Sequence, residues 1–205
     1  MLKKIAKWYG DMGAYIWDCR WFLAAVVVIF LVSCAMGSGI TLGAPGVSHA
    51  LIESYKNASA SSGDPSHPSV DLLWGIFSHN IFLDAISVFT GPILGIFPIL
   101  MSFANGLLFG VLVLAVYLKV GFLPVFVSIA PHGIVELPTM FLCMGMGLKL
   151  GWGLLVKTWT KEGRTLYVKE LILSTQVFAT VGVPLCLIAA LLETYVTTYL
   201  ITLVR

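Results

Sequence analysis

Two residues that could take part in proton or metal chemistry stand inside an apolar stretch of this sequence. Residues 131–138 read PHGIVELP, so His132 and Glu136 lie four positions apart between two prolines. On a helix this spacing places both side chains on one face. Within a membrane span, each ionisable group costs on the order of 3 kcal/mol on insertion scales, which makes the pair a candidate functional site.

Other polar residues interrupt the remaining apolar runs. Asp84 and Glu193 add two carboxylates, Asn105 adds an amide, and His79-Asn80 stands about one helical turn before Asp84. Together with the pair above they form a set that we call the polar cluster: His79, Asn80, Asp84, Asn105, His132, Glu136 and Glu193.

Three kinds of chemistry fit the polar cluster. In the first and simplest interpretation, its members satisfy one another and the backbone groups freed by the prolines, which fixes helix register. In the second, imidazole and carboxylate groups bind a metal such as Zn²⁺, with His79, His132, Glu136 and Glu193 as candidate ligands. In the third, the cluster lines a path for protons, ions or small solutes.

The composition is that of an integral membrane protein. Of the 205 residues, 59% are hydrophobic and 11% are charged, and the mean hydropathy is +0.96. Soluble domains carry about 25% charged residues. Several apolar runs also exceed the roughly 18 residues needed to cross a bilayer. We therefore predict an all-α, polytopic transmembrane helical bundle, and the net charge of +2 gives no basis for nucleic-acid binding.

The apolar runs predict about five spans with interrupted helices. The run 81–118 would exceed 50 Å as one helix, against roughly 30 Å of hydrocarbon, so it must fold back. The spans are placed at 21–42, on either side of a break at 91–98, at 124–148 and at 171–203. The last run is long enough for a tilted span with an extension, and a break at 182–184 is the alternative.

Residues 1–205 are predicted to form a single membrane domain with three polar parts. Residues 1–20 form an amphipathic segment, residues 43–80 a long loop, and residues 149–169 a basic loop. Because basic loops face the cytoplasm, we expect the first and third of these on the cytoplasmic side of the cell membrane. The 43–80 loop and the C-terminus are then expected on the outer side. This topology brings three separate spans to about one depth in the outer half of the membrane with these members of the polar cluster: His79, Asn80, Asp84, His132, Glu136 and Glu193.

Small residues mark the expected helix contacts. Gly106, Gly110, Gly133, Gly147 and Gly151 recur on the third and fourth apolar runs and predict close backbone approach between spans. The four cysteines are too scattered for a CxxC pair, and those within spans are expected to behave as small apolar residues.

Four segments in this order resemble the stage II sporulation protein M family, also called DUF95. They are FSHNIFLDAI at 77–86, FANGLLFGV at 103–111, PHGIVELPTMFLCMGMGLKLG at 131–151 and AALLETYVT at 189–197. Family members often have two asparagines where this chain has His79-Asn80. The positions to which the resemblance gives importance are Asn80, Asn105, Gly106, Pro131, His132, Gly133, Glu136, Gly147, Gly151 and Glu193.

The resemblance implies an all-helical polytopic protein that acts without catalysis. In endospore-forming bacteria the named member is a scaffold that recruits cell-wall hydrolases for engulfment. No nucleophile–base arrangement or nucleotide loop is recognisable, so no catalytic residue and no cofactor is expected. We predict a scaffold or assembly factor whose partners are the lipid bilayer and either a second copy, as a homodimer, or other membrane proteins. The alternatives are an oligomeric transporter of ions or small solutes and an intramembrane metal-dependent hydrolase.

Overall fold

The protein is an all-helical bundle, which confirms the predicted fold class. The computed structural model describes residues 2–59 and 67–203, without the side chains of 2–5, 56, 58–59, 132 and 202. Within these described residues, five helices are long and apolar enough to cross a membrane: Arg20–Gly43, Val70–Phe89, Ile96–Val120, Gly133–Lys157 and Lys161–Ile201. The protein is therefore a multi-pass membrane protein.

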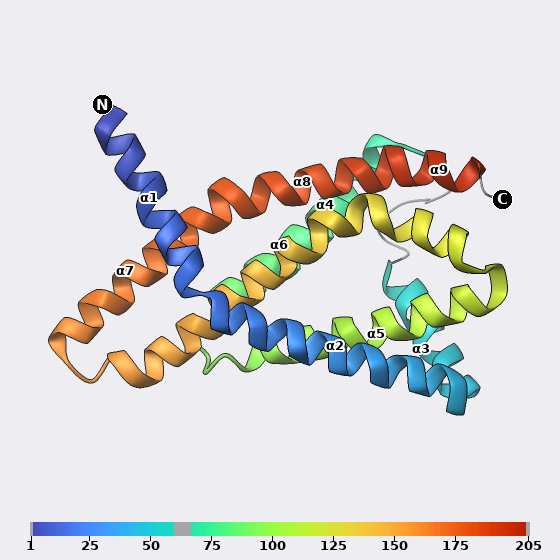
Figure 1. Ribbon diagram of the computed structural model, residues 1–205, viewed down its shortest axis with the longest axis horizontal. Helices are drawn as coiled ribbons and strands as arrows, with labels where there is room; N and C mark the ends of the chain where they lie inside the picture. Colours follow the sequence, from blue (N-terminus) through green and yellow to red (C-terminus); the bar gives the residue numbers. More distant parts are fainter. Residues whose placement is uncertain (1, 60–66, 204–205) are drawn as a thin grey trace.

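The described chain forms nine α-helices joined by short turns and two π-helical turns. The α-helices are α1 (Leu2–Asp18), α2 (Arg20–Gly43), α3 (Pro45–Ser59), α4 (Val70–Phe89), α5 (Ile96–Val120), α6 (Phe122–Lys157), α7 (Lys161–Val177), α8 (Val183–Leu191) and α9 (Thr198–Leu203). The π turns η2 (Phe178–Gly182) and η3 (Leu192–Thr197) join α7, α8 and α9 into one long rod (Figure 1).

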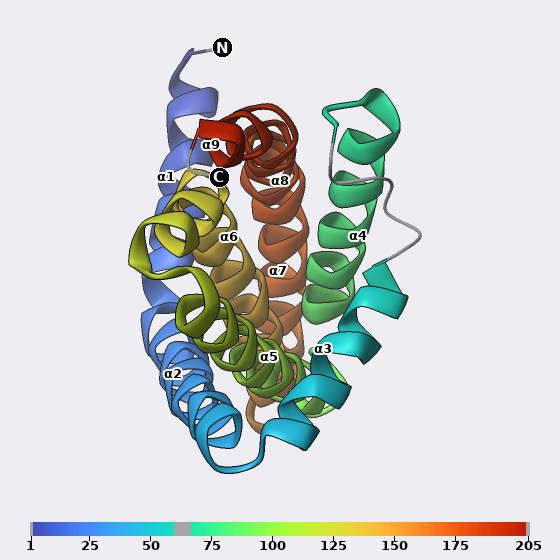
Figure 2. The same cartoon turned by 90° about the vertical axis from the view of Figure 1, so that its right-hand side faces the viewer.

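The bundle has two ends that we name by their contents. The turn end holds the connections at 90–95 and 158–160, on the left of Figure 1. The α3 end, on the right, holds α3, the reversal at Gly121 and the end of α9. Figure 2 looks onto the α3 end and shows α3 crossing it from α2 towards α4.

Small residues fix the contact between α2 and α5. A Cβ on Gly37 would overlap the backbone of Leu107, and one on Gly106 would overlap Phe30 and Ser33. The Ser102 hydroxyl donates a 2.7 Å hydrogen bond across this contact to the Val26 carbonyl. The two helices approach this closely because glycine and serine, with no side chain or a small one, occupy the crossing.

Helix α6 changes direction along its length, as Figure 1 shows. Gly121 has a φ of 85°, which a glycine adopts without strain, and the chain reverses there between α5 and α6. Pro131 and Pro138 lie inside α6. A proline removes one helical hydrogen bond and kinks the helix, so we attribute the bend to these residues.

The N-terminal amphipathic segment forms a helix, α1, which packs on α7. Met12 and Tyr15 are buried, and the Trp8 indole donates a 3.2 Å hydrogen bond to the Gln176 amide oxygen. Tyr9 and Trp17, two other aromatic residues of α1, are 62% and 67% exposed. The aromatic residues of α1 are therefore split between contact with α7 and an open side.

The two polar stretches expected as loops at 43–80 and 149–169 are mostly helical. Residues 45–59 form α3, and α4 begins at Val70, where the Ser69 hydroxyl accepts a 3.0 Å hydrogen bond from the Leu72 amide. Residues 60–66 of the first stretch lie outside the described residues.

In the second stretch α6 continues to Lys157 and α7 begins at Lys161, so only 158–160 forms a turn. The basic residues of this stretch do not mark a loop, because Lys149 and Lys157 are ion-paired with Glu170 and remain within helices.

The last span is continuous through Gly182 and Pro184, so the alternative of a break there is wrong. The turn η2 ends at Gly182, and Pro184 follows in the first turn of α8. A π turn widens the helix by one residue, which makes room for a proline within a continuous rod.

Candidate functional site

The polar cluster surrounds a chamber of about 670 Å³ near the α3 end. Its walls come mainly from α4, α5, α6 and the end of the last rod. The members of the polar cluster that line it are His79, Asn80, Asp84, Asn105, Glu136 and Glu193. Residue 132 lies on α6 beside Gly133, which lines the chamber, and the side chain of His132 is outside the described residues.

Three carboxylates from three different helices share this chamber. Glu136 lies close enough to both Glu193 and Asp84 for their charges to interact. Asp84 is 5% exposed, whereas Glu136 and Glu193 are half-buried. Like charges in a medium of low dielectric repel strongly, so the chamber favours a proton or another cation between them.

Two thiols surround Asp84 at the deep side of the chamber. The Cys186 thiol donates a 3.1 Å hydrogen bond to Oδ2 of Asp84, and the Cys143 thiol also interacts with this carboxylate. All four cysteines are free. The expectation that the cysteines behave only as small apolar residues therefore misses a polar role. The sequence did contain a signal that Cys143 faces the polar cluster. Cys143 follows Glu136 by seven positions, which is two turns along one helical face.

The backbone of the last rod sets the position of Glu193. This residue is the second of the turn η3 and is followed by Thr197 and Thr198, which also line the chamber. The Thr198 hydroxyl donates a 3.4 Å hydrogen bond to the Glu193 carbonyl, five residues back. Single π turns inside α-helices are frequent at functional sites because they redirect side chains.

An apolar wall completes the chamber. Phe30 of α2 and Phe109 of α5 line it with ring centroids 5.6 Å apart. Met140 and Met144 line it from α6. Asn105 is partly satisfied by its own helix, because its amide donates a 2.8 Å hydrogen bond to the Met101 carbonyl. The chamber is thus acidic on one part of its surface and apolar on another.

The described residues do not form a metal centre. Among the side chains at 6–55, 57, 67–131, 133–201 and 203, no group of three or more His, Cys, Asp or Glu residues is placed to hold a metal ion. His79, Glu136 and Glu193, three of the four candidate ligands, line the chamber without such a grouping.

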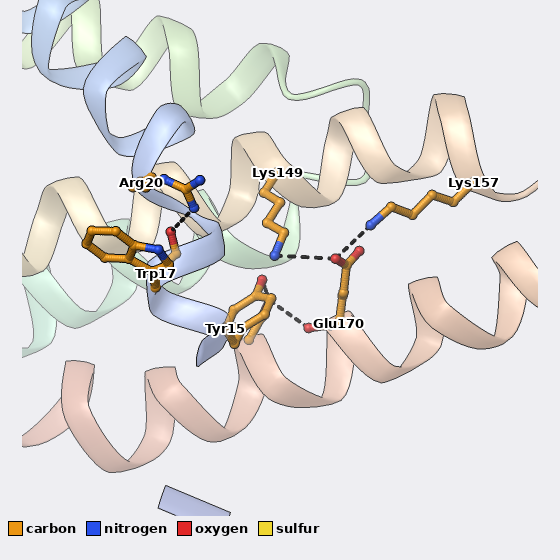
Figure 3. A network of polar contacts seen from close by, with 7 residues as sticks. Tyr15, Trp17, Arg20, Lys149, Lys157 and Glu170 are labelled. Atoms are coloured by element: carbon orange, nitrogen blue, oxygen red, sulfur yellow. Dashed lines mark hydrogen bonds and ion pairs between the residues drawn. The ribbon is translucent and has the colours of Figure 1, made fainter. Parts of the chain in front are cut away.

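A second polar group, which we call the ion-pair cluster, lies near the turn end (Figure 3). Oε1 of Glu170 lies 3.3 Å from the Lys149 ammonium and 2.7 Å from that of Lys157. The Lys149 ammonium also lies 4.1 Å from the centroid of the Tyr15 ring, and the Tyr15 hydroxyl shares a hydrogen bond with Ser174. The cluster joins α1, α6 and α7.

Burial also shifts the acidity of groups where α1 meets this cluster. It raises the pKa of the Tyr15 phenol above its ordinary range, and it raises the pKa of the Cys19 thiol to about 11. The sequence predictions missed Glu170 because the last span was placed from residue 171 onward. The signal was its position at the start of an apolar run, with Lys157 thirteen residues earlier.

Four of the five glycines expected to pack helices together do contact another element, and one does not. A Cβ on Gly110 would overlap Cys34 of α2, one on Gly147 would overlap Ser87 of α4, and one on Gly151 would overlap the 91–95 turn. Gly106 packs on α2, as described above. Gly133 differs, because within 4 Å its Cβ would meet only the Ile129 side chain of its own helix. Gly133 therefore does not pack against another helix and instead lines the chamber.

Comparison with known proteins gives one match. The family model described as Stage II sporulation protein M matches residues 26–198, which include all four segments named above. No curated protein matches the chain. No solved structure matches it.

Proposed function

Because the chain belongs to the stage II sporulation protein M family and carries an acid-lined chamber between its spans, we propose that it is a permease-like protein for ions or small solutes. The single observation that carries this proposal is the meeting of Asp84, Glu136 and Glu193 around one chamber. Three carboxylates held together in a membrane span are costly for folding, and proteins keep such groups where they bind or move charge.

The interrupted helices support a transport role. Secondary transporters bind their substrates near the middle of the membrane, beside helices that are broken or widened. Here α6 contains Pro131 and Pro138, and η3 carries Glu193. Such interruptions are points where one part of a helix can move against the other.

The turn end supplies the closed side that alternating access requires. Gly147 and Gly151 place α6 in backbone contact with α4 and the 91–95 turn, and Met146 and Leu150 are fully buried there. The positive-inside rule favours a cytoplasmic turn end, with the chamber facing outward. On this proposal the chamber is open to the outside and closed towards the cytoplasm. Five spans are few for a transporter, so we expect it to work as an oligomer.

Flux measurements test this proposal. Purified protein is reconstituted into liposomes loaded with a pH-sensitive dye, and a potassium gradient with valinomycin drives proton entry. We expect flux above that of empty liposomes, with a loss of at least about tenfold in Glu136→Gln and in Glu193→Gln because each removes one protonatable group of the chamber. Glu162→Gln, at an exposed site on α7, serves as the matched control.

The same liposomes are used in a second assay, which measures the uptake of labelled small cations. Equal flux in the wild-type protein and both chamber variants, or no flux of protons or cations at all, would contradict the proposed function.

A scaffold is the second candidate, and one observation favours it. Helix α1 extends beyond the bundle in Figure 1, and it exposes Tyr9 and Trp17. Aromatic side chains of this kind suit either a membrane surface or a partner protein. Gentle extraction from native membranes followed by identification of co-purified proteins tests this role. Removal of residues 1–18 should release a true partner, and an unchanged partner set would count against α1 as the docking element.

A further inference from the structure

The shape of the chamber points to a ligand larger than an inorganic ion. Its volume of about 670 Å³ falls within the roughly 300–1,000 Å³ typical of small-molecule sites. A bare cation or a proton needs only the space between the carboxylates. The lining also includes many apolar side chains from α2, α5 and α6, with a few uncharged polar ones such as Asn105 and Ser128, so the remaining volume suits an organic body.

The charges around the chamber define the sign of the ligand. The lining carries three carboxylates, and the described residues of the lining include no lysine or arginine. The ion pairs of Lys149 and Lys157 are made to Glu170, which is not part of the chamber. His79 is the one described group of the lining that can carry a positive charge, so the three carboxylates outnumber it, and a cationic ligand would be stabilised among them.

The apolar wall defines the rest of the ligand. Phe30 and Phe109 present aromatic rings, which attract cations as well as apolar groups. Met140 and Met144 present flexible thioethers, which adapt to ligands of different shape. A ligand that places its charge towards Asp84, Glu136 and Glu193 can therefore rest its apolar part on this wall.

We propose that the chamber binds a monovalent organic cation with an apolar body, such as a substituted ammonium or phosphonium. The inference rests on the same chamber as the proposed function and names its substrate class. Inorganic ions and protons interact with the carboxylates alone, whereas an organic cation also uses the apolar wall.

Two ions of matched size and opposite charge test this inference. Binding of tetraphenylphosphonium and of tetraphenylborate to the purified protein in an uncharged detergent is measured by equilibrium dialysis. We expect saturable binding of the cation and none of the anion. Glu136→Gln and Glu193→Gln should each weaken cation binding by about tenfold, the effect of losing roughly 1.4 kcal/mol of charge interaction. Glu162→Gln should leave the affinity unchanged.

A variant of the apolar wall keeps the inference falsifiable where the carboxylate variants fail to fold. Leu112 lines the chamber on α5, so Leu112→Trp should fill part of the volume and weaken cation binding while every carboxylate remains. Equal binding of both ions, or cation binding that neither the glutamine variants nor Leu112→Trp weakens, would overturn the inference.

The binding and flux assays separate this inference from the proposed function. Saturable cation binding without flux would support the ligand class and contradict a permease. Flux of protons or inorganic cations without tetraphenylphosphonium binding would support the permease and overturn the ligand class.

Discussion

The two ends of the bundle are packed in opposite ways. At the turn end, Gly147 and Gly151 bring helix backbones into contact, and Lys149 and Lys157 pair with Glu170. Near the α3 end, the helices separate around a chamber in which carboxylates face one another. The difference indicates that stability is concentrated at the turn end, while the α3 end gives up stability for a site, as functional regions commonly do.

The largest expected effect comes from adding one methyl group at the turn end. In Gly147→Ala the new Cβ would overlap the Ser87 carbonyl of α4. Backbone cannot move aside as a side chain can, so we expect a loss of about 3 kcal/mol and a fall of about 10 °C in melting temperature. Thermal unfolding in detergent, followed by gel filtration of the heated samples, measures it.

The matched change on the same helix is Gly133→Ala. Its Cβ would meet only the Ile129 side chain, at 3.3 Å, and alanine favours a helix over glycine by about 1 kcal/mol. We expect no loss of stability. Equal falls in the two variants would show that the ends do not differ in packing.

The second effect tests the buried charges of the turn end. Lys149 is nearly fully buried, whereas the Lys157 side chain is 34% exposed. Lys149→Met should cost between about 2 and 3 kcal/mol because Glu170 loses its buried partner, and Lys157→Met should cost less than about 1 kcal/mol. Thermal unfolding compares the two variants.

The double variant Lys149→Met with Glu170→Met serves as the control for this prediction. It should recover most of the stability, since an apolar pair can replace a buried ion pair. A double variant as unstable as the sum of the single changes would refute the pairing.

The third effect is a pH dependence where α1 meets the bundle. Burial raises the pKa of Cys19 from 9.0 to about 11, so the folded protein favours the neutral thiol. The resulting stability, between about 2 and 3 kcal/mol, is complete below pH 9 and is lost as the pH rises through 11. Unfolding measured across this range in wild type and Cys19→Ala isolates the contribution. Parallel pH profiles for the two proteins would disprove it.

The smallest effect is expected at the chamber. Glu136→Gln and Glu193→Gln each remove one of three facing carboxylates, so stability should stay the same or rise by less than about 1 kcal/mol. The same thermal assay checks this result. A loss above about 2 kcal/mol in either variant would instead favour the interpretation in which the polar cluster fixes helix register.

Much of the fold follows from hydropathy, because apolar runs of sufficient length have few alternatives in a bilayer. The five spans and the reversal at 90–95 were predictable on this basis. The helical character of α3 and of the residues after Lys149 was not. Polar composition resembles that of a loop, and only the partner helices decide whether a lysine such as Lys149 is exposed or paired.

The site was less accessible to sequence reasoning. The positions of Asp84, Glu136 and Glu193 along their spans predict that these three residues share one depth in the membrane. Which side chains face a common space depends on helix rotation and crossing, and single-chain hydropathy does not supply these. The thiols of Cys143 and Cys186 beside Asp84 illustrate this, because the sequence separates Cys186 from Asp84 by 102 residues.

The two π turns have a consequence for how chain length can change in this protein. Each turn holds one residue more than an α-helix needs, and one residue corresponds to about 100° of helix rotation. Loss of one residue within 178–182, with a return to regular α-helix, would remove this extra residue and leave the rod beyond it, including Glu193, on the same face. A single-codon deletion there would thus keep Glu193 at the chamber, whereas the same deletion within the regular helix α8 would turn Glu193 by about 100° away from it.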